Sequence, residues 1–282
     1  MIRLSNNNDI NGIISLWKEA FGDSEKDIIF FLNTHYKPEN TVVYDSEGII
    51  ASVLFLLDGE MHINGVDYSS YYLYAACTLK NFRGRGIMSQ MLEFSECIAS
   101  ERNKKFIALK PAEASLYDYY SRFGYKSVFS KKIISIENTD NNEYVESDNL
   151  NNNYASPIRD NVYDFINYFK WDNYSVNFAI EHQKYFGGNI IQNGNGYLLY
   201  RINDKTIFVN ENTFSAIEFK KHAFGLLNKY SADKIIAELP VDFTFDENNF
   251  EIIKSGMLLP LCEKAEKLIE NIDNAYLALT LD

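Results

Sequence analysis

The sequence contains few cysteines, few histidines and no long apolar run. Its 282 residues include three cysteines, an odd number, and no CxxC pair occurs among them. Isolated cysteines are typical of a reducing compartment and argue against a zinc site. The four histidines are scattered and form neither a metal-ligand nor a triad pattern. We therefore expect no metal; the residues concerned are Cys77, Cys97, Cys262, His35, His62, His182 and His222.

Apolar runs and basic side chains are also too scarce for two large classes of protein. No apolar run reaches the roughly 18 residues that a membrane-spanning helix needs, and the first ten residues contain no apolar signal region. The 27 basic residues are outnumbered by 39 acidic ones, which leaves a net charge of −12. Nucleic-acid phosphates require clustered Lys and Arg. We therefore predict a soluble, cytoplasmic protein that binds neither membranes nor nucleic acid.

The charge that is present is unevenly distributed. Residues 1–136 carry 15 basic and 16 acidic side chains, whereas residues 137–282 carry 12 basic and 23 acidic ones. Two interpretations remain open. The acidic half serves solubility, or it attracts a cationic substrate such as an amine.

A segment without basic residues divides the chain. Residues 137–157 contain seven asparagines and five acids, no Lys or Arg, and only scattered apolar residues. This composition is typical of a linker. We therefore predict a first domain over residues 1–136, a linker over 137–157 and a second domain over 158–282.

The first half alternates between helical and strand periodicity. Ile10, Ile13, Trp17 and Phe21 share one helical face, and Asn64-Gly65 is a typical hairpin turn. The order ααβββαβαβ predicts an α/β (α+β) fold with a mixed central sheet flanked by helices. The expected helices cover residues 8–22, 24–36, 87–103 and 115–124, and the expected strands 40–48, 49–63, 66–79, 105–111 and a pair within 125–136.

The second half repeats part of this order in a weaker form, which suggests a structural duplication. Residues 252–261 occupy the place that residues 120–129 occupy in the first half. The expected helices cover 163–171, 175–188 and 215–230, a hairpin covers 196–211 around Asn203-Asp204, and strands cover 233–239 and 274–282.

One junction in the first half has a composition with no counterpart in the second. Gly84 and Gly86 alternate with Arg83 and Arg85, after an expected strand and before an expected helix. Glycines allow a phosphate to approach the free N–H groups of a helix N-terminus. A phosphate-binding turn, a nucleic-acid contact and an ordinary tight turn are three interpretations of this pattern.

Two known phosphate motifs do not occur at this junction. The Walker A string GxxxxGK[ST] is absent from the sequence. The dinucleotide fingerprint GxGxxG fails because Ser89 stands in place of its third glycine, and residues 104–110 contain no acid for a ribose. The net charge argues against nucleic acid.

The string "FRGRGIMSQML" resembles the acetyl-CoA signature R-x-x-G-x-[GA] of the GCN5-related N-acetyltransferases (GNAT). Arg83 and Gly86 match this signature, whereas Met88 departs from its final small residue. "YYSRFGY", residues 119–125, resembles the second signature of the family. The expected order of elements over residues 1–136 agrees with the family fold.

More narrowly, the sequence resembles the enhanced-intracellular-survival type of acetyltransferase. That group joins an active acetyltransferase domain to a degenerate one and then to a sterol-carrier-like domain. We expect tandem GNAT folds here, the second of them degenerate, and an end of the chain before any third domain. The catalytic C-terminal carboxylate of that group is not carried over to Asp282.

The resemblance implies roles for individual residues. Tyr120 would be the general acid that protonates the departing CoA thiolate. The base is not identified, since Glu113 and water are both candidates, and Cys77 is expected to be a buried strand residue rather than a nucleophile. The residues implied in acetyl-CoA binding are Ala76, Cys77 and Thr78 for the pantetheine arm, Gly84, Arg85, Gly86, Ile87, Met88 and Ser89 with Arg83 for the pyrophosphate, and Ala112 and Glu113 near the acyl group.

The sequence therefore predicts direct acetyl transfer from acetyl-CoA to a primary amine, either a small molecule or a lysine. Two alternatives remain open. One is a CoA-binding sensor or scaffold without turnover, and the other is a protein-interaction module that uses the acidic half. The second half either shapes the acceptor cleft or mediates dimerisation, so homo-oligomer formation stays open.

Overall fold

The computed structural model describes residues 1–138, 155–194, 196–245 and 250–280. These residues form two compact units, which we describe separately. Unit 1 comprises Met1–Glu60, Tyr68–Lys126 and Leu258–Ile269, and unit 2 comprises Met61–Asp67, Ser127–Met257 and Glu270–Asp282.

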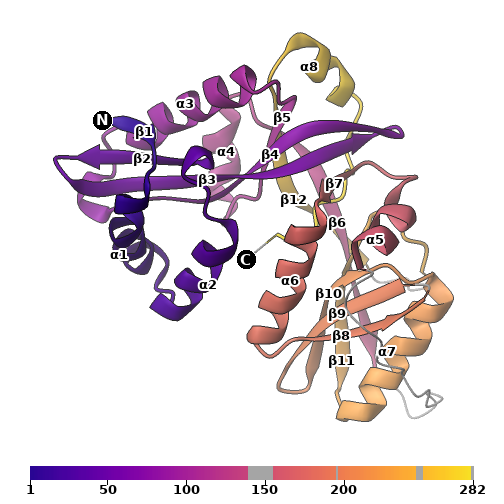
Figure 1. Ribbon diagram of the computed structural model, residues 1–282. Coiled ribbons are helices and arrows are strands. Elements are labelled where there is room, and N and C mark those ends of the chain that lie inside the picture. Colours follow the sequence, from indigo (N-terminus) through magenta and orange to yellow (C-terminus); the bar gives the residue numbers. More distant parts are fainter. Residues whose placement is uncertain (139–154, 195, 246–249, 281–282) are drawn as a thin grey trace. The chain divides into compact units, whose positions relative to one another are not determined.

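Unit 1 is an α/β unit with a mixed sheet (Figure 1). Its strand order is β1-β2-β3-β4-β5-β12, in which the pairs β1–β2 and β2–β3 are antiparallel and the pair β4–β5 is parallel. The elements that lie mainly in unit 1 are β1 (Ile2–Leu4), α1 (Ile10–Phe21), α2 (Glu25–His35), β2 (Thr41–Ser46), β3 (Ile49–Ile63), β4 (Val66–Thr78), α3 (Ile87–Glu101), β5 (Phe106–Leu109), α4 (Ser115–Ser121) and α8 (Glu263–Ile269), with short 3₁₀ turns at Asn7–Asp9, Pro38–Asn40 and Lys80–Phe82.

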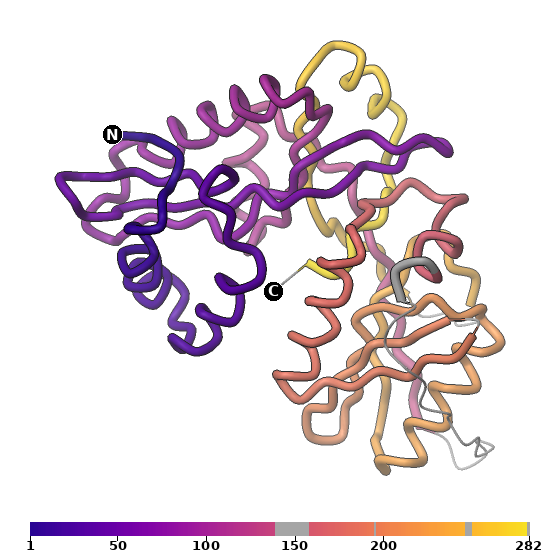
Figure 2. The backbone as a smooth tube through the Cα atoms, in the orientation of Figure 1, coloured from indigo at the N-terminus to yellow at the C-terminus, as the bar shows by residue number. Residues whose placement is uncertain are grey.

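Local sequence signals produce the main elements of unit 1. Helix α1 buries Ile13 and Trp17 of the expected face together with Leu16, whereas Phe21 of that face is exposed. Ser24 caps α2 through the N–H of Asp27. Strands β3 and β4 form the long hairpin that Figure 2 traces. Both residues of its Asn64-Gly65 turn have left-handed φ values, 50° and 79°, as a type I′ turn requires. Apart from the exposed Phe21, these sequence predictions are confirmed.

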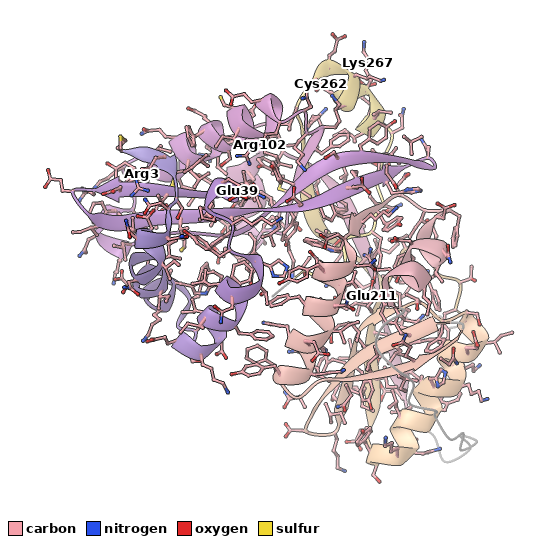
Figure 3. The ribbon with its side chains drawn as sticks, in the orientation of Figure 1. Arg3, Glu39, Arg102, Glu211, Cys262 and Lys267 are labelled. Atoms are coloured by element: carbon pink, nitrogen blue, oxygen red, sulfur yellow. The ribbon has the colours of Figure 1, made fainter. Side chains whose placement is uncertain are left out.

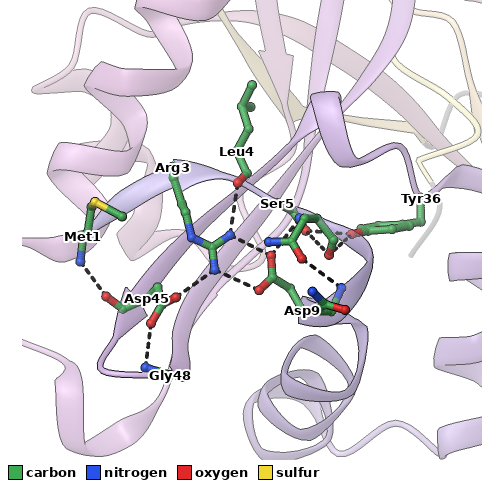
Figure 4. A network of polar contacts seen from close by, with 10 residues as sticks. Met1, Arg3, Leu4, Ser5, Asp9, Tyr36, Asp45 and Gly48 are labelled. Atoms are coloured by element: carbon green, nitrogen blue, oxygen red, sulfur yellow. Dashed lines mark hydrogen bonds and ion pairs between the residues drawn. The ribbon is translucent and has the colours of Figure 1, made fainter.

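The N-terminal strand β1 has only three residues and did not stand out in the sequence. An ion-pair network holds it against its neighbours (Figure 4). The Arg3 guanidinium lies 2.7 Å from Asp9 and 2.7 Å from Asp45. Its hydrogen bonds lower the pKa of both carboxyl groups. Such a short strand depends on these long-range contacts, which sequence periodicity does not report.

Arg102, just beyond the C-terminal end of α3, makes a second set of long-range contacts within unit 1 (Figure 3). Its guanidinium donates to the carbonyl of Glu39 at 2.7 Å and to the side chain of Asn40 at 2.8 Å. The same guanidinium lies 3.1 Å from the hydroxyl of Tyr71. These bonds attach α3 to the segment before β2.

Unit 2 contains the neighbouring strands β6-β11-β10-β9-β8, again with mixed pairing. Strand β10 is parallel to β11, and the neighbouring pairs β8–β9, β9–β10 and β6–β11 are antiparallel. The elements that lie mainly in unit 2 are β6 (Lys126–Glu137), α5 (Ala155–Tyr163), β7 (Tyr168–Trp171), α6 (Asn173–Tyr185), β8 (Asn189–Asn193), β9 (Gly196–Asn203), β10 (Thr206–Asn212), α7 (Ala216–Tyr230), β11 (Lys234–Leu239) and β12 (Phe250–Pro260).

A buried ion pair lies in the core of unit 2. The side chains of Arg159 and Glu211 are both 0% exposed, and their nearest charged atoms are 2.9 Å apart. The second Glu211 oxygen accepts from the hydroxyl of Tyr197 at 2.7 Å, and Arg159 also donates to the carbonyl of Phe169. Figure 3 labels Glu211 within this unit. The carboxylate therefore has hydrogen-bond donors on both oxygens, as a buried charge requires.

Several sequence predictions for the second half were wrong. Residues 163–171 were expected to be one helix, but α5 ends at Tyr163 and the strand β7 follows, because this aromatic-rich segment packs as a strand. Residues 274–282 were expected to be a strand, yet among those described only Ala275 and Tyr276 form isolated bridges. In the first half, residues 125–136 were expected to be a strand pair but lie in the single strand β6, Lys126–Glu137. Strand β8 was missed.

The predicted linker largely lies outside the described residues, which resume at 155. The compact units do not divide at a single place in the sequence. Residues 258–269 come from the second half yet belong to unit 1, where β12 is the neighbour of β5. The domain boundaries expected from composition stay a prediction.

Candidate active site

The glycine-containing junction is a turn between β4 and α3. Strand β4 ends at Thr78, a 3₁₀ turn follows, and α3 begins at Ile87. Gly84 and Gly86 have φ values of 73° and 71°. This left-handed conformation costs a residue with a side chain about 1–2 kcal/mol, so both positions favour glycine.

Helix α3 begins without a capping side chain. Its N-cap is Gly86, and no acid occurs in its first turn. Three other helices, α2, α6 and α7, begin with the capping side chains Ser24, Asp172 and Ser215. The first four N–H groups of a helix have no intrahelical partner, and the helix dipole makes that end positive. The start of α3 therefore offers donors to an anion.

The two arginines of the turn also brace it. The Nε of Arg83 donates to the carbonyl of Thr78 at 2.9 Å. Arg85 donates to the carbonyl of Asn81 at 2.8 Å, and its guanidinium lies 5.1 Å from the centre of the Phe82 ring. Both arginines remain exposed. They therefore hold the turn in shape and place positive charge beside the start of α3.

Strand β4 separates from β5 before the turn. The parallel pairing joins Ser70–Tyr72 to Phe106–Ala108 and does not extend to the end of β4 at Thr78. Within this stretch Ala75 has a φ of 49°, which is unusual for a residue with a side chain. The end of β4 therefore presents an edge that β5 does not occupy.

Cys77 lies near the end of β4 and is 7% exposed. Its carbonyl accepts a hydrogen bond from the hydroxyl of Ser52 at 2.7 Å. Burial raises the pKa of its thiol to about 12. Because the thiolate is the reactive form, this cysteine is not an activated nucleophile. That agrees with the structural role expected from the sequence.

Tyr120 lies on α4, the helix that follows β5. The side chain is buried between the rings of Tyr119 and Tyr125, whose centres are 5.3 Å and 5.6 Å away. Burial is the main cause that raises the pKa of the Tyr120 phenol to about 12, and the neighbouring Tyr119 adds to this effect. Within the described ranges the Tyr120 hydroxyl makes no hydrogen bond. The phenol is therefore protonated at neutral pH.

Ala112 and Glu113 lie between β5 and α4, and both are exposed. One carboxylate oxygen of Glu113 accepts from the hydroxyl of Ser115 at 2.6 Å. Glu113 is therefore a solvent-exposed carboxylate with a local hydrogen-bond partner. The identity of the general base therefore stays open.

Topology brings the predicted residues to one edge of the sheet in unit 1. Strands β4 and β5 are parallel neighbours, so the residues that follow them, at the start of α3 and before α4, lie at the same edge. The predicted site residues are buried at Cys77, Ile87 and Tyr120, half-buried at Ala76, Thr78, Met88 and Ser89, and exposed at Arg83, Gly84, Arg85, Gly86, Ala112 and Glu113.

No group of three or more His, Cys, Asp or Glu side chains among the described residues could hold a metal ion. No described helix is both long enough and apolar enough to cross a membrane.

Several solved structures described as acyltransferases or as an Eis protein have a fold similar to that of this chain. A probable N-acyltransferase from Enterococcus faecalis V583 matches with a TM-score of 0.73 and 13% identity, over 93% of this chain and 72% of that one. A GCN5-related N-acetyltransferase from Kribbella flavida matches with 0.69 and 11%, over 92% and 70%. Eis1 from Mycobacterium abscessus matches with 0.67 and 14%, over 93% and 74%. These likenesses establish the fold.

The family assignment rests on the sequence itself. Residues 1–128, a little under half of the chain, match the model of the acetyltransferase (GNAT) domain. No curated protein matches the sequence significantly. Family and fold together support an acyltransferase of the N-acetyltransferase type. The expected resemblance to the GNAT family and the expected mixed α/β fold are thereby confirmed.

Sequence reasoning missed two residues at this edge of the sheet. The left-handed backbone of Ala75 could not be predicted, because the sequence "YLYAACT" contains no glycine or asparagine that would indicate it. Ser52 does carry a signal, because it is a polar residue inside the apolar run "IIASVLFLL". A buried hydroxyl in such a run requires a hydrogen-bond partner.

Proposed function

We propose that unit 1 transfers an acetyl group from acetyl-CoA directly to a primary amine. The observation that supports this most strongly is the glycine-flanked, uncapped start of α3 beside the open edge of β4. Free N–H groups suit a pyrophosphate, and an unpaired strand edge suits the amide groups of a pantetheine arm. An ordinary tight turn would not require both features.

The residues present fit the cofactor in a defined arrangement. The amides from Gly84 to Ser89 would hold the pyrophosphate, with Arg83 and Arg85 adding positive charge. The backbone of Ala76–Thr78 would hold the pantetheine arm, and Ala112 and Glu113 would lie near the acyl end. When bound, acetyl-CoA supplies an activated thioester that an amine attacks without a covalent enzyme intermediate.

Tyr120 is the proposed general acid. As the C–N bond forms and the C–S bond breaks, the phenol donates its proton to the departing sulfur and regains one from the acceptor ammonium or from water. A phenol pKa of about 12 keeps that proton in place until charge develops on sulfur. A positioned acid of this kind contributes roughly 10²–10⁴-fold.

The acceptor is proposed to be cationic at neutral pH, either a small amine or a lysine side chain. The support is the charge of residues 137–282, which carry 23 acidic and 12 basic side chains. Such a surplus raises the local concentration of cations and weakens with salt. We further propose that unit 2 is a degenerate copy of the GNAT fold, because its β8-β9-β10-α7-β11 order matches β2-β3-β4-α3-β5.

The first experiment is thermal unfolding with and without acetyl-CoA, with ADP as the control. Ligand at about 100 times Kd should stabilise the protein by about 2.7 kcal/mol, a shift of several degrees. A shift with acetyl-CoA and little with ADP would support the cofactor. No shift at millimolar acetyl-CoA would contradict the proposal.

The second experiment compares Tyr120→Phe with Tyr119→Phe, a neighbouring tyrosine on the same helix. Free CoA and acetylated amine are measured by mass spectrometry. We expect kcat to fall roughly 10²-fold or more in Tyr120→Phe and to change little in Tyr119→Phe. Equal rates would remove the role of Tyr120, and binding without turnover in the wild type would favour the sensor.

The pH profile tests the same role. The active phenol is the protonated form, present below its raised pKa of about 12 and lost only above it. The acceptor amine must be neutral, so kcat/KM should rise as pH increases from about 7 to 10 without a falling limb. If kcat/KM instead fell with pH in this range, and this fall disappeared in Tyr119→Phe, the general acid would be Tyr119 and not Tyr120.

A further inference from the structure

A buried serine from the neighbouring strand lies against the end of β4. Ser52 is 0% exposed and belongs to β3. Its Oγ lies 2.7 Å from the carbonyl oxygen of Cys77 and 2.8 Å from the hydroxyl of Thr78. One side chain therefore contacts two consecutive residues at the edge proposed to bind the pantetheine arm.

The direction of both hydrogen bonds follows from the chemistry of the groups. A carbonyl only accepts, so the single Ser52 proton is donated to Cys77. The Thr78 hydroxyl must then donate to the Ser52 oxygen. The two contacts form an ordered chain from Thr78 through Ser52 to Cys77.

This chain sets the direction in which the backbone of β4 faces. The Cys77 carbonyl points toward Ser52, and the Leu79 N–H donates to the carbonyl of Ala51 at 2.9 Å, so both groups face β3. Backbone groups of successive strand residues point to alternate edges. The N–H groups of Ala76 and Thr78 therefore face the opposite edge, where the pairing with β5 has already ended.

The carbonyls at this edge are not equally available. The carbonyl of Thr78 already accepts from Arg83 at 2.9 Å. By the alternation of the strand, the other groups that face away from β3 are both backbone groups of Ala76 and the N–H of Thr78. Cys77 was expected from the sequence to share this backbone contact, but its carbonyl is used by Ser52 on the other side.

We propose that Ser52 is a positioning residue for acyl-CoA. It holds the peptide groups at Cys77 and Thr78 so that Ala76 and Thr78 present their backbone to the pantetheine arm. This inference rests on the proposed function and deepens it. Removing the hydroxyl allows these peptides to rotate, which weakens the alignment of the thioester.

The test compares Ser52→Ala with Ser70→Ala. Ser70 is also 0% exposed and donates to a backbone carbonyl, that of Tyr68, at 2.7 Å, but it lies at the start of β4. Ser52→Ala loses two hydrogen bonds and Ser70→Ala loses one, so Ser52→Ala should also lose somewhat more stability. We expect the Kd for acetyl-CoA to rise about fivefold to tenfold only in Ser52→Ala. The KM for acetyl-CoA should follow, with a smaller change in the KM for the amine.

Equal Kd values in the two variants would overturn the inference. If Ser52→Ala does not fold, Thr78→Val removes the other hydroxyl of the chain at a half-buried position, and Thr78→Ser restores it. Weaker binding in Thr78→Val with recovery in Thr78→Ser is the expected result, and unchanged binding in Thr78→Val would overturn it. Absence of acetyl-CoA binding in the wild type would instead contradict the proposed function.

Discussion

The two units contain the same strand–helix–strand arrangement, but the turn between the first strand and the helix differs between them. In unit 1, β4 leads into the 15-residue helix α3 and then into the parallel strand β5. In unit 2, β10 leads into the 15-residue helix α7 and the parallel strand β11. In both pairs the pairing stops before the first strand ends, at Tyr72 in β4 and at Val209 in β10.

The difference lies in what occupies the turn and the strand edge. Helix α7 is capped by Ser215, whose hydroxyl accepts from the N–H of Glu218, an acid in the first turn. Near the end of β10, the carbonyl of Asn212 accepts from the hydroxyl of Tyr163 at 3.0 Å, and Arg159 and Tyr197 bind the buried Glu211 carboxylate. The two turns therefore share a topology, but only the one before α3 has helix N–H groups without a capping side chain, which is what an anion site needs.

The largest expected effect is on the buried pair of unit 2. Arg159→Ala leaves the Glu211 carboxylate buried without its cation, which should lower the free energy of unfolding by roughly 3–5 kcal/mol. Urea denaturation measures it, with the exposed Arg201→Ala as the control. The double variant Arg159→Leu with Glu211→Leu should lose less than Arg159→Ala alone. A loss below about 1 kcal/mol in Arg159→Ala would contradict the burial of an ion pair.

The second effect concerns the glycine turn of unit 1. Gly86→Ala should lower the free energy of unfolding by about 1–2 kcal/mol, because its φ is 71°. Sterics contribute little, since a Cβ there would meet nothing nearer than the Gln90 side chain at 4.0 Å. The control is Gly194→Ala, where φ lies outside the left-handed range and no atom lies within 4 Å. Thermal unfolding should distinguish the two, and equal values would argue against strain at Gly86.

The smallest effect concerns the capped helix of unit 2. Ser215→Ala removes the cap of α7 and should cost about 1 kcal/mol. Acetyl-CoA affinity, measured by calorimetry, should remain unchanged because α7 is not proposed to bind the cofactor. A weakened affinity in Ser215→Ala would place the ligand at the wrong turn and break the comparison.

Much of the fold of unit 1 could be predicted from the sequence because its signals are local. The apolar face of α1, the Ser24 cap and the Asn64-Gly65 turn each depend on residues close together in the chain. The same holds for the positive φ values of Gly84 and Gly86 and for the uncapped start of α3. Part of the candidate site was therefore already visible as a strand–glycine–helix pattern.

The sequence by itself determined the local elements and the turn that identifies the GNAT family. Only the tertiary structure decided that β12 joins the sheet of unit 1, that Ala75 is left-handed and that Glu211 is buried against Arg159. It also revealed Ser52 beside Cys77, two residues that are 25 positions apart. These features depend on pairing and burial between distant segments, whose energies no short stretch of sequence contains.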